Sequence, residues 1–310
     1  MRRFLARLLL FSVPLMASGV AMVLVDPYNF LGVSHLVPDE VKARTSAKLN
    51  YPLWEMLRFR RRPKADILLG DSRMMTLKPE AIRAAGGADC YNFAYGGGSV
   101  PEIMSTFWFA DSVTRLRSVV VGVNFNMYNA RARHDRTADY RELTENPCLY
   151  FVNRTVVRAA FTCVRAMVTG RVPQIERPPM NHEQFWAYQL KVTAADSYRH
   201  YAYPVEFREG LRGMADRCRE RGIRLTFIVF PTHADLQSRV ADFGLLREQE
   251  RFRADLRSIA TTHDFDVPGA LTRERANFED PYHFREPVMR RIVREVWGTS
   301  GIEEPAPVRR

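Results

Sequence analysis

Asp66-Ile67-Leu68-Leu69-Gly70-Asp71-Ser72 decides the fold: an apolar run is followed at once by a glycine, a carboxylate and a hydroxyl. Its apolar part lacks the alternation of a half-exposed strand, which predicts a strand buried on both faces. Four further short runs read as strands, at residues 90–93, 118–121, 225–230 and 264–267. Helical patterns separate the runs, at about residues 77–86, 99–115, 205–222, 246–262 and 285–297. This alternation predicts an α/β fold, with a five-stranded, mostly parallel, doubly wound sheet between two helical layers.

Short polar motifs follow the predicted strands at the point where each strand ends. Gly70-Asp71-Ser72 follows the first strand, Gly96-Gly97-Gly98 the second and Gly122-Val123-Asn124 the third. Asp280-Pro281-Tyr282-His283 follows the last strand and precedes the last helix. Because the carboxyl ends of parallel strands lie at one edge of a sheet, we expect these motifs to meet there.

Together these motifs supply the groups that acyl transfer through a serine requires. A spacing of three residues lets Asp280 reach Nδ1 of His283, which leaves Nε2 to take the proton of Ser72. The glycines around Gly97 let a backbone N–H turn towards an oxyanion, and the amide of Asn124 can donate to it. Each residue alone also has a structural interpretation, as a helix cap, a turn, an Asx turn or a surface side chain.

The ordered set of motifs resembles the SGNH (GDSL-like) hydrolase superfamily over about residues 65–297. That superfamily carries Gly-Asp-Ser in its first block, a glycine in its second, Gly-x-Asn in its third and Asp-x-x-His in its fifth. The resemblance implies a flavodoxin-like sheet and a triad of Ser72, His283 and Asp280. It also implies an oxyanion hole formed by Ser72, Gly97 and Asn124. No metal ion or organic cofactor is needed for this chemistry.

The sequence departs from the superfamily pattern at two positions. Arg73 stands where the GDSL type has leucine, and Phe125 stands where its third block ends in aspartate. These changes argue against the secreted lipases and leave the triad residues untouched. Arg73 is a candidate for substrate binding, and so is His233, which follows the fourth strand. A loop histidine with satisfied hydrogen bonds is the alternative for His233.

The N-terminus indicates export. Three arginines within the first seven residues precede an uncharged run from Leu8 to Val25. As a helix this run would extend about 27 Å, which suffices to cross the core of a bilayer. The positive flank should stay in the cytoplasm, which predicts a single bacterial inner-membrane span with the rest of the chain in the periplasm. A cleaved signal peptide, cut after Gly19-Val20-Ala21, and a buried helix are the alternatives.

The sequence pattern also predicts how the chain is divided into regions. Beyond a signal anchor at residues 1–32, the sequence predicts an irregular, charged connector at 33–64 and the SGNH-like domain at 65–297. Residues 127–200 interrupt the alternation and are interpreted as an insertion over the sheet edge, with a helix from about residue 150 to 169. Residues 298–310 are expected to form a tail.

The spacing of the four cysteines argues against a structural zinc site. Cys90, Cys148, Cys163 and Cys218 form no C-x-x-C motif and no zinc pattern. A Cys148–Cys163 disulfide is compatible with export, but free cysteines that are small and buried are the commoner case.

The net charge is +11, but Lys and Arg are spread along the chain without a nucleic-acid-binding motif. The sequence therefore predicts no nucleic-acid partner, and a basic surface would also suit anionic glycans or lipid head groups.

The expected anchor and the residues Asp26-Pro27-Tyr28 indicate a subgroup within the superfamily. They are similar to membrane-anchored SGNH-like proteins that modify exported polysaccharides, such as the alginate O-acetylation group. This resemblance implies a serine esterase or O-acyltransferase that acts on an acylated polysaccharide beside a membrane-bound O-acyltransferase. A non-catalytic glycan-binding or scaffold protein on the same fold is the main alternative. A nucleotide binder is disfavoured, because the first strand–helix turn has no G-x-G-x-x-G or P-loop pattern.

Overall fold

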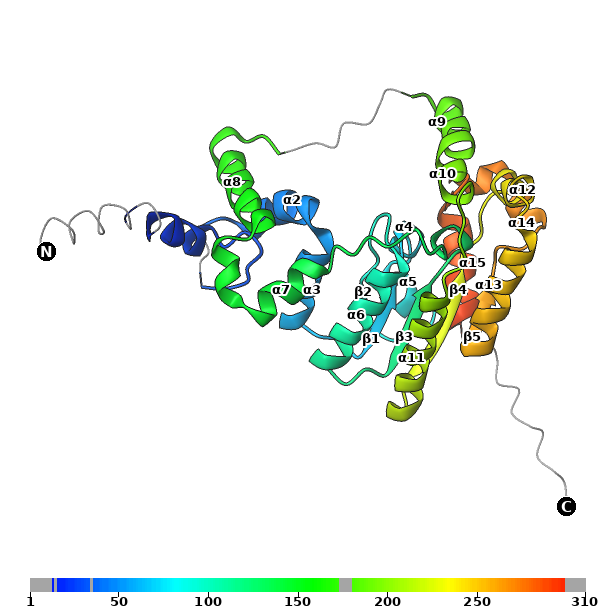
Figure 1. Cartoon of the computed structure of the whole chain (residues 1–310), viewed down its shortest axis with the longest axis horizontal. Helices are drawn as coiled ribbons and strands as arrows, with labels where there is room; N and C mark the ends of the chain where they lie inside the picture. Colours follow the sequence, from blue (N-terminus) through cyan, green and yellow to red (C-terminus); the bar gives the residue numbers. More distant parts are fainter. Residues whose placement is uncertain (1–12, 14–15, 34–35, 173–179, 299–310) are drawn as a thin grey trace, which may run out of the picture. The chain divides into compact units, whose positions relative to one another are not determined.

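The computed structural model describes residues 13, 16–33, 36–172 and 180–298, which fall into two units (Figure 1). The first unit combines the chain up to residue 62 with residues 136–178. The second combines residues 63–135 with the chain from residue 179 onward. Residues 127–200, expected as one insertion, are therefore divided between the two units.

A five-stranded parallel sheet forms the centre of the second unit, in the order β2–β1–β3–β4–β5 (Figure 1). The strands are β1 (Asp66–Leu69), β2 (Cys90–Asn92), β3 (Ser118–Gly122), β4 (Arg224–Val229) and β5 (Thr261–Asp264). This confirms the predicted α/β fold with its parallel sheet. Strand β5 begins three residues before the predicted position 264, because this edge strand has a polar Thr-Thr-His-Asp sequence that an apolar pattern does not detect.

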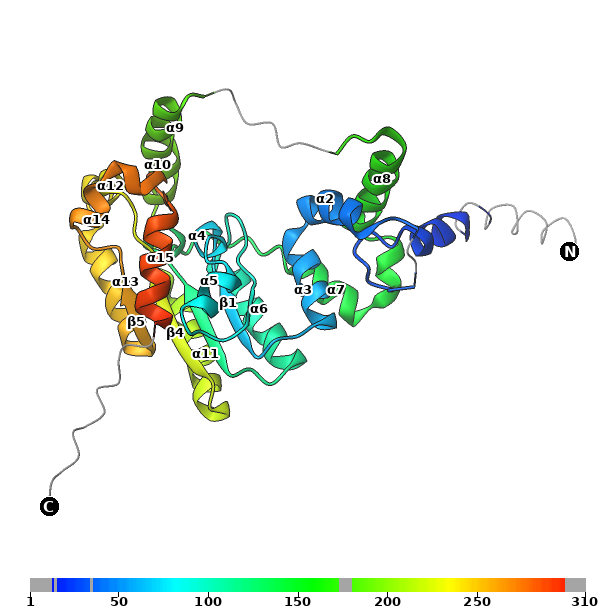
Figure 2. The ribbon, with the colours of Figure 1, turned by 180° about the vertical axis from the view of Figure 1, so that it is seen from behind.

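Helices cover both faces of the sheet. On one face lie α6 (Val100–Val113), α11 (Val205–Arg221) and α13 (Leu246–Ile259). On the other face α5 (Pro79–Ala84) packs against α15 (Glu286–Trp297), which Figure 2 shows from behind. In α15 the apolar residues recur at helical spacing and are buried: Val288, Met289, Ile292 and Val293. They join Leu68 of β1 and Ile82 of α5 in one hydrophobic core.

Short elements at the carboxyl edge of the sheet carry the polar motifs. They are α4 (Ser72–Met75), the 3₁₀ turn η1 (Phe125–Met127), α12 (Ala234–Asp242) and a two-stranded hairpin of β6 (Phe278–Asp280) and β7 (His283–Phe284). A longer helical stretch also belongs to this unit: α9 (His182–Tyr188), the π-helical turn η3 (Gln189–Thr193) and α10 (Ala194–Tyr198). Of the short elements, α4, η1 and α12 each follow a strand of the sheet, whereas α14 (Ala270–Arg273) and the 3₁₀ turn η4 (Arg275–Asn277) separate the hairpin from β5.

The first unit is helical. Its labelled α-helices are α2 (Asp39–Leu49), α3 (Tyr51–Arg61), α7 (Ala138–Glu145) and α8 (Arg154–Thr169), and residues 16–25 and the 3₁₀ turn η2 (Pro147–Phe151) are also helical. The prediction of an irregular connector at 33–64 is therefore wrong, because α2 and α3 occupy most of it. Asn50 caps α3 by accepting a hydrogen bond from the N–H of Leu53, and Pro52 occupies its first turn. These two local signals, and not a periodic apolar stripe, mark the helix start.

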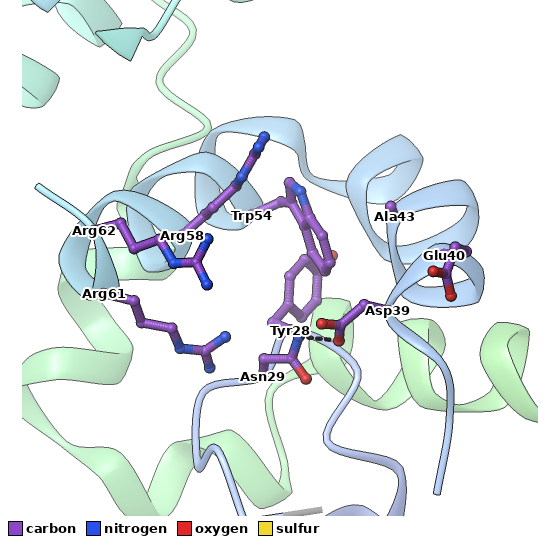
Figure 3. A pocket seen from close by; sticks show the side chains of 9 residues that line it. All are labelled: Tyr28, Asn29, Asp39, Glu40, Ala43, Trp54, Arg58, Arg61 and Arg62. Atoms are coloured by element: carbon purple, nitrogen blue, oxygen red, sulfur yellow. Dashed lines mark hydrogen bonds between the residues drawn. The ribbon is translucent and has the colours of Figure 1, made fainter. Parts of the chain in front are cut away.

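A cavity of about 470 Å³ lies within the first unit, between α2, α3 and the segment that precedes α2 (Figure 3). Tyr28 and Trp54 lie at its centre. Charged side chains of both signs line its walls: Arg58, Arg61, Arg62, Asp39 and Glu40. The amide Nδ2 of Asn29 donates to Asp39 at 2.8 Å, which fixes one side of the cavity.

All four cysteines are free, and all except the exposed Cys148 are buried. The Cys148–Cys163 disulfide is thus not formed. In the part of the chain that the structure describes, no helix has both the length and the apolar character of a membrane span. Residues 16–25 are helical, whereas residues 1–12 and 14–15 of the expected anchor, and 299–310 of the expected tail, lie outside the described residues.

Candidate active site

Ser72 lies at the carboxyl end of β1, at the first position of α4. The strand–turn–helix passage depends on Gly70, where a Cβ atom would lie 2.8 Å from the Cβ of Met74 and 3.2 Å from the carbonyl oxygen of Gly122. Asp71 then adopts extended backbone and caps α4 by accepting from the N–H of Arg73 at 2.9 Å. These local constraints present the Ser72 hydroxyl at the edge of the sheet.

His283 connects Ser72 with Asp280. Its Nε2 atom lies 2.8 Å from Oγ of Ser72, and its Nδ1 atom lies 2.8 Å from Oδ2 of Asp280. The other carboxylate oxygen, Oδ1, accepts the backbone N–H groups of Tyr282 at 2.8 Å and His283 at 3.1 Å. The β6–β7 hairpin therefore holds the carboxylate from both sides, and the three residues form a continuous hydrogen-bonded relay.

The charge of Asp280 determines which ring nitrogen of His283 carries the proton. Burial opposes ionisation of this carboxyl, but hydrogen bonds from His283 and from the backbone outweigh it, and the pKa of Asp280 falls below its ordinary value. An ionised carboxylate only accepts, so Nδ1 of His283 carries the proton. In the neutral imidazole Nε2 is then the acceptor for the Ser72 hydroxyl, which is the arrangement that a general base needs.

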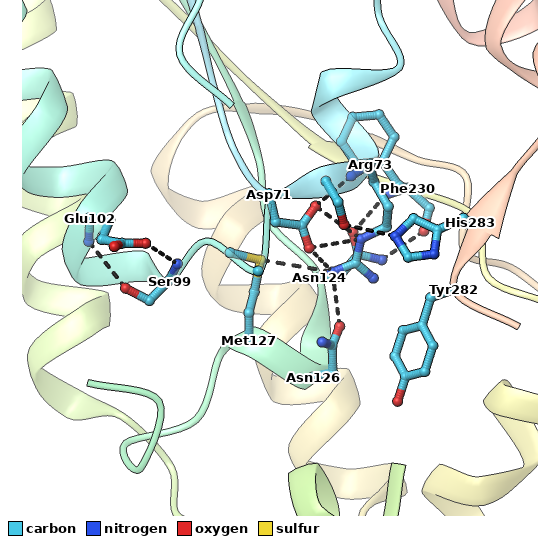
Figure 4. A network of polar contacts seen from close by, with 12 residues as sticks. Asp71, Arg73, Ser99, Glu102, Asn124, Asn126, Met127, Phe230, Tyr282 and His283 are labelled. Atoms are coloured by element: carbon cyan, nitrogen blue, oxygen red, sulfur yellow. Dashed lines mark hydrogen bonds and ion pairs between the residues drawn. The ribbon is translucent and has the colours of Figure 1, made fainter. Parts of the chain in front are cut away.

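Arg73, expected as a possible substrate-binding residue, is buried, with only 1% of its surface exposed. Its Nε atom donates to both oxygens of Asp71, at 3.1 and 3.0 Å, and its Nη2 atom also pairs with that carboxylate. Nη2 donates further to Oδ1 of Asn126 at 3.0 Å (Figure 4). Arg73 therefore ties the serine-bearing turn to η1.

Electrostatic interactions favour the charged form of Arg73. Burial works against the Arg73 guanidinium, but the adjacent carboxylate of Asp71 outweighs it and the pKa of Arg73 rises above its ordinary value. Nη1 of Arg73 is buried and has no hydrogen-bond partner among the residues that the structure describes. Figure 4 shows the side chain of Tyr282 near this group, and burial raises the pKa of Tyr282 to about 12.

The glycine loop after β2 is held by a histidine from outside the predicted motifs. Gly97 has φ of +61°, a left-handed conformation that favours glycine, and a Cβ atom there would meet nothing within 4 Å. Nε2 of His134 donates to the carbonyl oxygen of Gly97 at 2.9 Å, and Oγ of Ser99 donates to the carbonyl of His134 at 2.5 Å. The loop is thus held at the carbonyl group of Gly97.

Asn124 is buried, and its side chain pairs with the backbone of Phe230 at the end of β4. Its Nδ2 atom donates to the carbonyl oxygen of Phe230 at 2.7 Å, and its Oδ1 atom accepts the N–H of that residue at 3.2 Å. One of the two amide hydrogens is therefore used within the sheet edge. Only the second amide hydrogen is left for the expected oxyanion role.

His233 is also buried, at 6% exposure, and its ring packs edge-on against Trp186 and Phe278. Its Nδ1 atom accepts the N–H of Asp235 at 3.1 Å as the cap of α12. Its backbone N–H donates to the carbonyl oxygen of Pro281 at 2.9 Å. These contacts give His233 a structural role at the start of α12, but they do not satisfy both nitrogens of its ring. Within the described chain, Nε2 of His233 is buried without a hydrogen-bond partner.

The helical stretch 180–200 also contacts the hairpin. Nε2 of His182 donates to the carbonyl oxygen of Glu279 at 2.8 Å, and the indole N–H of Trp186 donates to Asp235 at 3.0 Å. Neither His182 nor His134 belongs to a motif, so the sequence alone predicts no role for them. Their partners are backbone carbonyl groups 97 and 37 positions away, which no local pattern reveals.

Comparisons with known proteins find no matching family and no matching curated protein. Among solved structures, a GDSL-like lipase from Bacteroides thetaiotaomicron is 8% identical, with a TM-score of 0.42 over 77% of this chain and 95% of that one. A protein of inferred acylhydrolase activity from Bacteroides fragilis is 11% identical, with a TM-score of 0.40 over 76% and 86% of the two chains. A G-D-S-L family protein from Desulfitobacterium hafniense is 11% identical, with a TM-score of 0.37 over 75% and 97%. At these identities and TM-scores the likeness alone assigns this chain no activity.

Proposed function

We propose that this chain is a serine esterase or O-acyltransferase that works through an acyl-serine. The single observation that carries the proposal is the relay from Ser72 through His283 to Asp280, with both hydrogen bonds at 2.8 Å. In the first step Nε2 of His283 removes the hydroxyl proton as Oγ of Ser72 attacks the acyl carbonyl. The Asp280 carboxylate stabilises the imidazolium that forms.

The carbonyl oxygen becomes an oxyanion and needs hydrogen-bond donors. Among the described residues, the backbone N–H groups of Ser72 and Gly97 have no hydrogen-bond partner, so both are available to donate. The second amide hydrogen of Asn124 would add a third donor. Loss of one such donor typically costs about 3–4 kcal/mol of transition-state stabilisation.

The second half of the cycle reverses the proton transfers. His283 gives its proton to the departing alkoxide, which leaves the acyl group on Oγ of Ser72. His283 then removes a proton from water or from a sugar hydroxyl, and the resulting oxygen attacks the acyl carbonyl. Collapse of this second intermediate breaks the bond to Oγ and returns the proton to Ser72. No step needs a metal ion or an organic cofactor.

The proposed substrate is the acyl group of an exported or cell-surface polysaccharide. The sequence features that support this choice are the arginine-flanked apolar run at the N-terminus and the residues Asp26-Pro27-Tyr28, which together are similar to anchored polysaccharide O-acetylation proteins. The proposed setting is a bacterial inner membrane with residues 65–297 in the periplasm. A membrane-bound O-acyltransferase would deliver the acyl group, and no nucleic acid takes part.

Turnover of a model ester tests the proposal. The full-length protein should release p-nitrophenol from p-nitrophenyl acetate, and Ser72→Ala should not. Adding a panel of neutral and anionic oligosaccharides should divert acetyl groups from water to sugar if the chain is a transferase, which mass spectrometry of the sugars would detect. Absence of release by the folded wild-type protein, or equal release by Ser72→Ala, would overturn the proposal.

A glycan-binding or scaffold protein remains the second candidate, and one observation favours it. The Asn124 amide is partly used by the Phe230 backbone, and Phe125 replaces the aspartate of the superfamily's third block. A binding protein would bind acylated oligosaccharide equally well with Ser72→Ala and would release no acyl group. Calorimetric titration of both proteins with the same oligosaccharide separates the two functions.

A further inference from the structure

Helix α8 of the first unit presents an apolar stripe to solvent. Val157, Phe161, Val164 and Val168 are spaced at four, three and four residues, which places them within about 60° of one another around the helix. Phe161 is 71% exposed and Val168 is 81% exposed. Such a row is unlike the scattered apolar residues of an ordinary surface, because its members adjoin one another along the helix.

The opposite side of α8 already has a partner. Val156, Ala159, Cys163 and Ala166 are buried, and α8 packs against α2. Sγ of Cys163 lies 3.0 Å from Oγ1 of Thr45, in the middle of this contact. The stripe therefore is not the core-facing side of α8, and the described residues of the first unit leave it exposed.

The charges along α8 all have one sign. Arg154, Arg158 and Arg165 are exposed and border the stripe on one side, and exposed Arg171 follows the helix end. The helix sequence RTVVRAAFTCVRAMVT contains no aspartate or glutamate. A helix with an apolar face, a purely basic border and modest overall hydrophobicity has the properties of a helix that lies in a membrane interface.

We propose that α8 docks this chain onto an anionic lipid bilayer. In that position the stripe enters the boundary between head groups and acyl chains, to a depth of about 5–10 Å, and the arginines contact lipid phosphates. A second apolar row supports a bilayer near this unit: Met16, Val20 and Leu24 are exposed at four-residue spacing on the helix of residues 16–25.

A second copy of the chain fits the stripe less well than lipid does. Pairing of two α8 stripes would bring four arginines from each copy together with no acidic residue on either helix, so like charges would oppose the contact. A bilayer that contains anionic lipid supplies both the apolar volume and the negative charge. The stripe and the triad belong to different units, so docking through α8 does not depend on the proposed catalytic function.

Depth-dependent quenching of a fluorophore tests this docking. The full-length protein with Cys148→Ser and Phe161→Cys carries an NBD label on α8, while the other cysteines are buried. It is reconstituted with vesicles of phosphatidylglycerol and phosphatidylcholine that contain doxyl-labelled lipid. A matched protein carries the label at Leu246→Cys, a 57% exposed position on α13 of the sheet unit. Thermal midpoints and far-UV circular dichroism check that both labelled proteins are folded.

Docking predicts strong doxyl quenching of the label at position 161, little at position 246, and a severalfold decrease at position 161 in pure phosphatidylcholine. Replacing Arg154, Arg158 and Arg165 by glutamine should remove this lipid dependence. Equal access of iodide and no doxyl quenching at both positions would overturn the proposal. Shielding of position 161 that grows with protein concentration in detergent, without doxyl quenching, would instead assign the stripe to a second copy and would also overturn it.

Discussion

Nε2 of His283 lies 2.8 Å from Oγ of Ser72, although 211 positions separate the two residues in the chain. Ser72 is held by the turn after β1, and His283 by the β6–β7 hairpin. The contact exists only when the complete second unit is folded. It also makes the two side chains one functional group, because neither can form the acyl-serine without the other.

Asp280→Asn should lower ester turnover by about 10⁴-fold, because the neutral amide no longer favours the imidazolium and selects the wrong tautomer of His283. The thermal midpoint at neutral pH should change by only a few degrees, since Asn retains an oxygen for the N–H groups of Tyr282 and His283. Steady-state kinetics and a thermal scan on one preparation measure both quantities.

Glu279→Gln is the matched control, because Glu279 is the exposed neighbour on the same strand. Its turnover should match the wild-type value within about twofold. Wild-type turnover in Asp280→Asn would remove this carboxylate from the mechanism.

The lowered pKa of Asp280 predicts a pH dependence of stability. A carboxyl whose pKa is lower in the folded state stabilises the fold above its unfolded pKa, and this contribution disappears as the pH falls through the folded pKa. The difference in unfolding free energy between wild type and Asp280→Asn should therefore be fully present at about pH 5 and shrink as the pH falls below about 4. Urea titrations of both proteins across this range measure it. A difference that grows towards acid pH would contradict the assigned direction.

Gly97→Ala should lower turnover, whereas Gly96→Ala should be nearly neutral. A Cβ atom meets nothing within 4 Å at Gly97, so any effect comes from the +61° φ angle, which alanine adopts at a cost of about 1–2 kcal/mol. Relaxation of this backbone would turn the N–H away from the oxyanion and reduce kcat by as much as about 10²-fold. At Gly96 the nearest contact, Sδ of Met75, lies at 3.9 Å. Equal kcat values for the two variants would exclude the Gly97 N–H as an oxyanion donor.

Arg73→Met should destabilise the protein by about 3–5 kcal/mol, because it leaves the Asp71 carboxylate buried without its partner. Arg73→Lys retains the charge but cannot bond both oxygens of Asp71 and also Asn126. If Arg73 positions the serine-bearing turn, the lysine variant should lose kcat with little change in KM. The double variant Asp71→Asn/Arg73→Met should recover part of the stability. An increase in KM alone would indicate that Arg73 binds substrate after all.

The sheet and the relay could be predicted from sequence because both depend on local patterns. Buried parallel strands are short apolar runs, and each motif follows a strand, so the topology brings Ser72 and the Asp280–His283 turn together. The connector could not be predicted in this way. Its two helices expose many charged side chains, and only the start of α3 has a side-chain cap, Asn50, whereas α2 has none.

The partners of individual polar residues were also beyond prediction. Arginine is ordinarily an exposed residue, and burial of Arg73 depends on the orientation of Asp71 and on Asn126, 53 positions away. The motif pattern identifies Asn124 but not the Phe230 backbone that uses part of its amide, because that contact spans 106 positions. Motifs give the residue types of a site, whereas the hydrogen-bond partners follow from the packed structure.

Trapping of the nucleophile tests the central claim most directly. The purified full-length protein is treated with a fluorophosphonate, digested and analysed by peptide mass spectrometry, in parallel with Ser72→Ala and His283→Ala. The relay predicts one stoichiometric adduct on Ser72 in the wild-type protein, none in Ser72→Ala, and a labelling rate lower by about 10³-fold or more in His283→Ala. A folded wild-type protein that gives no adduct, or an adduct on another serine that persists in Ser72→Ala, would contradict the acyl-serine mechanism.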